Sequence, residues 1–137
     1  MASRILIVDD EPDMLELLVH NLREAGYDII TAHAGKEALD QARRHLPDLI
    51  VLDLMLPDID GFSLCEILRC QRSTAEIPIV MLTAITGQIA RWHGLSAGAD
   101  DFLTKPVGMS QLRTRVQEVL ASRSEQTSRE GEDEPRT

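Results

Sequence analysis

The sequence predicts an α/β protein in which a parallel sheet lies between two layers of helices. Three apolar runs show no alternation of polar and apolar positions, which is typical of strands covered on both faces. These runs occupy residues 5–8, 49–52 and 79–82. Segments with helical spacing separate the runs, and connections of that length favour parallel strands with right-handed crossovers. We therefore expect a three-layer α/β/α sandwich built from five β-α units.

Each remaining element has its own signal. Residues 28–32 and 101–104 are weaker strand candidates, which complete a five-stranded parallel sheet. The connector over 87–97 shows helical spacing less clearly than the others. Apolar residues recur every three or four positions in four further segments, and each such stripe predicts a helix with one buried face. The stripes are Met14, Leu15, Leu18, Leu22 and Ala25; Ala38, Leu39 and Ala42; Leu64, Cys65 and Leu68; and Met109, Leu112, Val116, Val119 and Leu120.

Proline and glycine mark the ends of these elements. Pro12 follows two acids, as a proline in the first turn of a helix does. Gly26 comes directly after the first stripe, where the end of a helix favours a left-handed residue. Three further prolines, Pro47, Pro57 and Pro78, fall between predicted elements, as expected for residues that interrupt helices and strands.

The composition is that of one soluble folded domain. The chain has 137 residues, of which 43% are hydrophobic and 27% are charged, and this length suits a single core. Its net charge of −9 would repel nucleic acids and anionic membranes, so we expect neither as a direct partner. No apolar run approaches the roughly 20 residues that span a bilayer, and the first residues lack the hydrophobic stretch of a signal peptide. We expect a cytoplasmic protein.

The last part of the chain differs from the rest. Residues 122–137 contain no Leu, Ile, Val, Phe or Met. Such a segment buries no apolar surface that could offset the entropy lost when it is ordered. We therefore divide the chain into a folded domain over 1–123 and a disordered acidic tail over 124–137.

The residues that can carry chemistry stand at the carboxyl ends of the strands, where open parallel sheets bind their ligands. Asp9 and Asp10 follow the first strand, Asp53 the third, Thr83 the fourth, and Lys105 the fifth. Neighbouring carboxylates raise one another's pKa unless cations compensate them. Lys105 and a divalent cation would do so, and a small set of hard oxygen ligands suits Mg²⁺, with Mn²⁺ as a substitute.

The same set of residues predicts phosphoryl chemistry. Asp53 would be the nucleophile, because it ends the central strand, and Thr83 and Lys105 would hold phosphoryl oxygens opposite the metal. Purely structural roles are the simpler reading of some members taken alone. Asp9 and Asp10 could cap the first helix, and Thr83 or Lys105 could be an ordinary strand end or surface residue. Asp53 stands between two leucines, where an unpaired buried acid is costly, so function explains it better.

Four longer runs occur in one order and without long gaps over roughly residues 3–123. They are ILIVDDEP over 5–12, DLIVLDLMLPDIDG over 48–61, PIVMLTA over 78–84 and GADDFLTKP over 98–106. Together they resemble the receiver domain of two-component response regulators. The resemblance implies a flavodoxin-like receiver fold over 1–123, with the strand order 2-1-3-4-5.

The resemblance also implies a signalling switch that is activated by phosphorylation. Asp53 would accept a phosphoryl group from a histidine kinase, a phosphotransfer protein or a small acyl phosphate. Asp10, Asp53 and the backbone carbonyl of Met55 would bind Mg²⁺, with Asp9 contributing, often through water. Lys105 would contact the phosphoryl group. The chain would thus be a phosphoacceptor that assists its own phosphorylation and dephosphorylation, rather than an enzyme.

In such a switch, phosphate shifts the population toward an active form of the surface made by the fourth helix, the fifth strand and the fifth helix. Thr83 would swing toward the phosphate and Phe102, which lacks the hydroxyl of the more usual Tyr, would turn inward. The Lys105–Pro106 peptide bond would be cis. The surface would bind a downstream effector protein, an effector domain outside this sequence, or a second copy of the chain as a homodimer.

Some residues of that surface match the family and others depart from it. Arg91, Asp101 and Arg115 match charge pairs of relatives that dimerise there, whereas Gln111 stands where an acid is usual. Trp92 has two interpretations, as part of a face for a partner or as a core residue.

Near the phosphoryl site, Met55 and Ile85 are both apolar, and by family position they flank the phosphate. Apolar groups there orient an attacking water poorly. This predicts a long-lived aspartyl phosphate.

Three other functions share parts of the pattern. A phosphohydrolase with an aspartate nucleophile normally needs a second acid two residues later, but that residue is Met55. Asp58 and Asp60 resemble the middle of a calcium-binding loop, yet its first and last ligand positions would be Leu56 and Ile67. A phosphate-independent interaction module would keep the fold and lose the switch, and the complete acidic set argues against it.

Overall fold

The structure is a computed structural model that describes residues 2–84 and 88–133. The described part of the chain forms one parallel sheet of five strands in the order β2-β1-β3-β4-β5. The strands are β1 (Arg4–Val8), β2 (Asp28–Ala32), β3 (Leu49–Leu52), β4 (Ile79–Thr83) and β5 (Asp101–Thr104). The helices that alternate with them are α1 (Pro12–Glu24), α2 (Gly35–His45), α3 (Gly61–Cys70), α4 (Gln88–Ser96) and α5 (Met109–Asp133). The predicted fold and strand order are confirmed.

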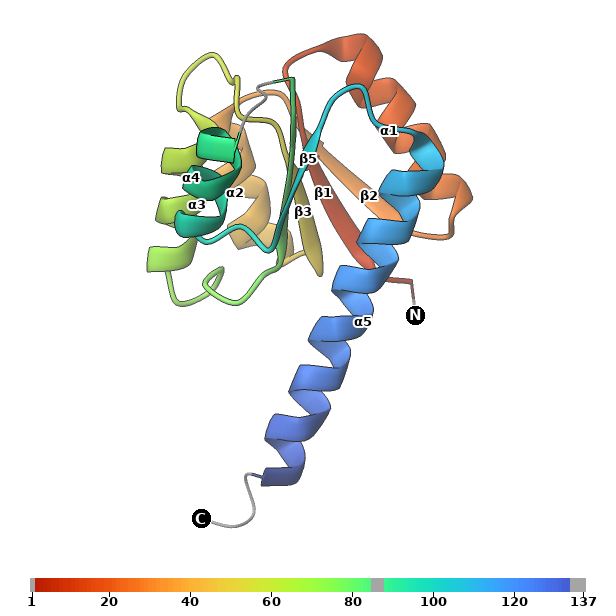
Figure 1. Cartoon of the computed structure of the whole chain (residues 1–137), viewed down its shortest axis with the longest axis vertical. Helices are drawn as coiled ribbons and strands as arrows, with labels where there is room; N and C mark the ends of the chain where they lie inside the picture. Colours follow the sequence, from red (N-terminus) through yellow and green to blue (C-terminus); the bar gives the residue numbers. More distant parts are fainter. Residues whose placement is uncertain (1, 85–87, 134–137) are drawn as a thin grey trace.

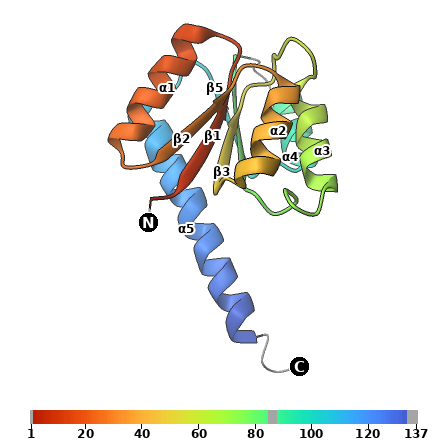
Figure 2. The ribbon, with the colours of Figure 1, turned by 180° about the vertical axis from the view of Figure 1, so that it is seen from behind.

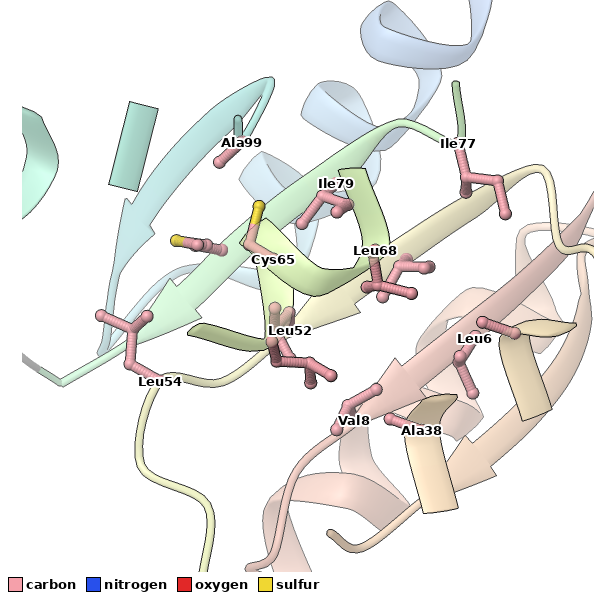
Figure 3. Packing of buried hydrophobic residues seen from close by; sticks show 14 of the residues in the cluster. Leu6, Val8, Ala38, Leu52, Leu54, Cys65, Leu68, Ile77, Ile79 and Ala99 are labelled. Atoms are coloured by element: carbon pink, nitrogen blue, oxygen red, sulfur yellow. The ribbon is translucent and has the colours of Figure 1, made fainter. Parts of the chain in front are cut away.

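Two layers of helices cover the sheet, with α1 and α5 on one face and α2, α3 and α4 on the other (Figures 1 and 2). Successive residues of each central strand point to opposite faces, so that the continuous apolar runs feed two separate cores. In β1, Ile5 and Ile7 pack with α1 and α5, while Leu6 and Val8 pack with α2 and α3. Figure 3 shows the second of these cores, where Leu6, Val8 and Leu52 approach the helices. This is the reason why the runs show no alternation.

The ends of α1 lie where proline and glycine predict them. Pro12 is its first residue. Gly26 follows the helix with a φ of +100°, a conformation that a side chain would strain. β2 then begins two residues later, so the glycine turns the chain from the end of α1 back along the sheet.

The last two helices bear on the position of Trp92 and on the end of the ordered chain. α4 begins at Gln88, as its weak spacing predicts, and its Trp92 is 70% exposed and therefore not a core residue. α5 continues to Asp133 and projects beyond the sheet (Figure 1), whereas disorder is predicted from 124. Its Ser, Glu, Gln and Arg residues tolerate helical geometry, so a helix nucleated by the packed Leu112 and Val116 can propagate. The division of the chain at residue 123 stays a prediction.

No helix within residues 2–84 and 88–133 is both long and apolar enough to cross a membrane. The two faces of the sheet instead account for the apolar helix stripes, because each stripe packs against strand residues in one of the two cores. The length of α5 does not change this, since its residues beyond 121 are those that the sequence shows to be without large apolar side chains.

The start of α3 packs against the chain that leaves β3. Gly61 donates its N–H to the carbonyl of Leu54 at 2.9 Å. A Cβ at Gly61 would lie 2.6 Å from the Cα of Leu54 and 2.9 Å from the carbonyl oxygen of Asp53. These are backbone atoms, so a side chain could be accommodated only if the loop moved.

We therefore predict that Gly61→Ala lowers the free energy of unfolding by about 1–3 kcal/mol, the usual cost of overpacking. Urea unfolding of the purified protein would measure the loss. Gly108→Ser is the matched control, because nothing lies within 4 Å of a Cβ at that position. Serine is a good N-cap, so this variant should gain at most a few tenths of a kcal/mol. Equal stability of Gly61→Ala and the unmodified protein would contradict the prediction.

Candidate functional site

The carboxyl ends of β1, β3 and β5 bring two buried acids and a lysine together. Asp9 and Asp53 directly follow β1 and β3 and are 1% and 7% exposed. The Nζ of Lys105, directly after β5, lies 2.9 Å from Oδ2 of Asp9 and 3.5 Å from Oδ2 of Asp53. A single ammonium group thus lies between two carboxylates that the sequence separates by more than forty residues.

Burial and these neighbours set the charge states at the site. Burial raises the pKa of Asp53, and the nearby charge of Asp9 acts in the same direction. The charge of Lys105 and the N–H of Met55, which donates to Oδ1 of Asp53 at 3.3 Å, oppose this rise without cancelling it. Burial by itself would lower the pKa of Lys105, but the hydrogen bond to Asp9 and the charges of both acids outweigh it, so that pKa is raised. The lysine is held in its charged form, while the charge on Asp53 remains costly.

Three carboxylates at this edge could share a cation. One carboxylate oxygen from each of Asp9, Asp10 and Asp53 lies within 4.8 Å of the other two. Asp10 is exposed, whereas both oxygens of Asp9 already accept hydrogen bonds, from Lys105 and from the N–H of Glu11 at 2.9 Å. Hard oxygen donors of this kind, with room for water, fit Mg²⁺. The hydrogen bonds of Asp9 suit the indirect contact predicted for it better than a direct one.

A hollow of about 490 Å³ opens above these acids. Carboxylates, an ammonium group and apolar side chains share its wall, and the side chain of Met55 at its edge is 61% exposed. This space can admit a phosphoryl group beside Asp53. The lining residues are Asp10, Glu11, Asp53, Met55, Leu56, Pro57, Ala84 and Lys105.

Thr83 joins this group less directly than the other predicted residues. It ends β4 in a fully buried position, and the next residue, Ala84, lines the hollow. The carbonyl of Thr83 accepts the N–H of Lys105 at 2.7 Å, so the main chain here positions the lysine. The Lys105–Pro106 bond is cis, as the resemblance implies. Ile85, the other residue predicted to flank the phosphate, lies outside the described residues.

The loop between β3 and α3 contains two acids whose role the sequence analysis missed. Asp60 caps α3 by accepting the N–H of Ser63 at 3.0 Å. Asp58 accepts the N–H groups of Gly35 and Lys36, at 2.7 and 3.0 Å, at the start of α2. These amide hydrogen bonds lower the pKa of Asp58. An aspartate directly before a helix is a recognisable N-cap. A carboxylate that caps a helix from a distant loop, as Asp58 does, leaves no pattern in the sequence near that helix.

The predicted output surface contains an ion-pair cluster within one chain. The buried carboxylate of Asp101 accepts a contact from Arg115 in α5 and lies 3.8 Å from Nη2 of Arg91 in α4. Helices α4 and α5 are therefore linked across β5 by charged groups. Phe102 in β5 is already buried, and a Cβ at Gly94 would lie 2.8 Å from its ring.

Comparison with known proteins agrees with this geometry. The family model of the response regulator receiver domain matches residues 5–117. The transcriptional regulatory protein PhoP of Bacillus subtilis, which acts in alkaline phosphatase synthesis, is 47% identical over 120 residues, covering 88% of this chain and 49% of PhoP. The master transcriptional regulator RpaA of a Synechocystis species is 48% identical over 118 residues, or 85% of this chain and 48% of RpaA. The chain thus spans about half the length of these relatives.

Solved structures show the same similarity in three dimensions. A putative response regulator from Chloroflexus aurantiacus is 42% identical and superposes with a TM-score of 0.85, covering 88% of this chain and 99% of that one. A CheY-like receiver domain protein from Methanospirillum hungatei is 28% identical with a TM-score of 0.86, covering 92% and 99%. Fold, acidic edge and sequence agree, and the chain belongs to the receiver domain family of two-component response regulators.

Proposed function

We propose that Asp53 is the phosphoacceptor of this receiver domain, and that it takes its phosphoryl group from a histidine kinase, a phosphotransfer protein or a small acyl phosphate. The observation that carries the proposal is the position of Asp53, buried beside a hollow with Lys105 3.5 Å from its Oδ2. The charge of this acid is costly to the fold, and the ammonium group of Lys105 lies beside it. Such a group is suited to react rather than to stabilise the folded protein.

The transfer needs a nucleophile and neutralisation of charge. A carboxylate oxygen of Asp53 attacks phosphorus. The bond from phosphorus to the donor's imidazole nitrogen, or to the acyl oxygen of an acyl phosphate, breaks. The imidazole or the carboxylate leaves with the electron pair of that bond. Asp10, Asp53 and the backbone carbonyl of Met55 would hold Mg²⁺, with Asp9 contributing, and the ion supplies positive charge to the phosphoryl oxygens. Lys105 would contact the phosphoryl group, and Thr83 would turn its hydroxyl toward it.

The readout of phosphorylation would be the surface formed by α4, β5 and α5. Charged groups of Arg91, Asp101 and Arg115 meet there within one chain, and Trp92 adds an exposed apolar side chain. Partner classes suited to this surface are a downstream effector protein, an effector domain linked to the receiver, and a second copy of the chain. In each case phosphorylation would shift the population between two arrangements of the surface.

Intact mass after incubation with acetyl phosphate and Mg²⁺ tests the phosphoacceptor. We expect the unmodified protein to gain one phosphoryl adduct and Asp53→Asn to gain none, because the amide is not a nucleophile. Asp58→Asn is the matched control, since Asp58 lies in the adjacent loop but binds the start of α2, and it should still be phosphorylated. An adduct on Asp53→Asn would contradict the assignment.

The exposed side chain of Met55 predicts the lifetime of the adduct. It borders the hollow and offers no group that could orient an attacking water. We expect a half-life of many minutes or longer after removal of acetyl phosphate, and a shorter one for Met55→Asn, whose amide can hydrogen-bond water. Loss of the mass adduct over time measures both. A half-life of seconds for the unmodified protein would be incompatible with this expectation.

The raised pKa of Asp53 predicts how stability changes with pH in metal-free buffer. The folded state holds the Asp53 proton to higher pH than the unfolded state does, so the free energy of unfolding falls as pH rises from about 4 through the raised pKa. The fall is roughly 1.4 kcal/mol per pH unit within that window. Asp53→Asn lacks this contribution, so its stability relative to the unmodified protein should increase across the window and then level off.

Urea unfolding with a chelator at several pH values measures this difference. Asp58→Asn provides a control of opposite sign, because the pKa of Asp58 is lowered and its carboxylate stabilises the fold above the unfolded value. An Asp53→Asn protein that loses stability relative to the unmodified protein as pH rises would refute the predicted sign.

A further inference from the structure

Arg69, near the end of α3, binds the chain that leaves α4. Its Nε donates to the carbonyl of Gly98 at 2.9 Å, and its Nη2 lies 3.0 Å from Oδ2 of Asp100. Both groups belong to the connection between α4 and β5. The side chain of Arg69 is only 21% exposed, so these contacts are partly shielded from water.

The same guanidinium also binds the segment before β4. Its Nη1 donates to the carbonyls of Ala75 and Ile77, at 3.1 and 2.6 Å. Asp100 completes the link, because its Oδ2 accepts the N–H of Ile79, the first residue of β4, at 2.8 Å. One side chain therefore joins the end of α4 to the starts of β4 and β5, at the end of the sheet opposite the phosphoryl site.

The backbone at the end of α4 is shaped to receive Arg69. Gly98 has a φ of +113°, and a Cβ on it would lie 2.8 Å from Cγ of Arg69. The N–H groups of Gly98 and Ala99 bind back to Leu95 and Gly94, both at 3.1 Å, which is the Schellman pattern of a firmly ended helix. We name the contacts of Arg69 with Gly98 and Asp100 the Arg69 anchor.

A second contact supports this end of the helix. The thiol of Cys65 in α3 donates a hydrogen bond to the carbonyl of Ala97 at 3.4 Å. Figure 3 shows the Cys65 side chain on the same side of the core as Ala99. The preceding part of α4 is held differently. There Arg91, whose side chain is 51% exposed, donates to the carbonyl of Phe102 at 2.8 Å, and the ring of His93 stacks on Phe62.

We propose that the Arg69 anchor is the pivot of the phosphorylation switch, so that α4 turns about its fixed C-terminal end when its N-terminal end responds to the phosphoryl site. This inference rests on the proposed function of Asp53. The contacts of Arg69 join α4 to the segment that leads into β4, where Ile77 and Ile79 are buried, so that this segment cannot shift without unpacking the core. The contacts of Arg91 and His93 involve exposed side chains, which can exchange partners at little cost. Arg69 is thus a positioning residue, remote from the reacting atoms.

Trp92 provides a direct measurement of α4, because it is the single tryptophan of the chain and lies on that helix. We would phosphorylate the protein with acetyl phosphate and Mg²⁺, confirm the adduct by intact mass, and record the change in tryptophan emission. In Arg69→Met, which keeps an apolar stem and loses every donor, the adduct should form as before. The emission change should fall to about half or less of the unmodified amplitude, because α4 has lost its pivot.

Two further variants separate the anchor from general stability. Asp100→Asn keeps an oxygen for the N–H of Ile79 but removes the charge opposite Arg69, and should give an intermediate emission change. Arg72→Met is the matched control, because Arg72 is an exposed arginine of the neighbouring loop, and its response should equal that of the unmodified protein. Hydrogen exchange gives a readout that needs no variant: phosphorylation should leave the amides of Gly98 and Ala99 protected while those of residues 91–94 change.

The outcomes distinguish this inference from the proposed function. No adduct on the unmodified protein would overturn the proposed function and the pivot together. An adduct with no change in Trp92 emission, or with equal changes in Arg69→Met and the unmodified protein, would overturn the pivot alone. Loss of protection at Gly98 and Ala99 would do the same, even if Arg69→Met failed to fold.

Discussion

The ammonium group of Lys105, placed between Asp9 and Asp53, is the interaction on which the site depends. One positive charge faces two buried carboxylates, so it compensates them only in part. Burial raises the pKa of Asp53, and Lys105 lowers that pKa without cancelling the rise. The remaining negative charge explains why this edge of the sheet would attract a divalent cation, and the same cation would offset the further negative charge that a phosphoryl group brings. Binding of a cation would therefore lower the electrostatic free energy that the folded protein carries at this edge.

The sheet makes this arrangement from residues that are distant in sequence. Parallel strands place all their carboxyl ends at one edge, and the buried runs of β1 and β3 fix the register at Val8 and Leu52, which are partners across the two strands. Asp9 and Asp53 follow that pair directly. The apolar core thus determines the separation of these two acids, and the rest of the fold keeps them close in spite of their repulsion.

Much of this could be predicted from the sequence, because local patterns encode it. Unbroken apolar runs mark strands covered on both faces, and the residue after each run marks the functional edge. The capping of α2 by Asp58 and the four bonds of Arg69 could not be predicted, since each joins segments that only the tertiary structure brings together. The end of α5 lies further along the chain than the sequence predicts, for another reason. The absence of apolar residues removes packing, but it does not prevent a packed helix from propagating further.

The loop after β3 has a consequence for how such a site can diversify. Asp58 and Asp60 tie the loop to the starts of two helices, which holds its main chain independently of the side chain at Met55. A ligand supplied by the carbonyl at this position would be indifferent to which amino acid stands there. On the proposed function, exchange of this one exposed side chain would change the lifetime of the aspartyl phosphate and leave the affinity for the ion unchanged.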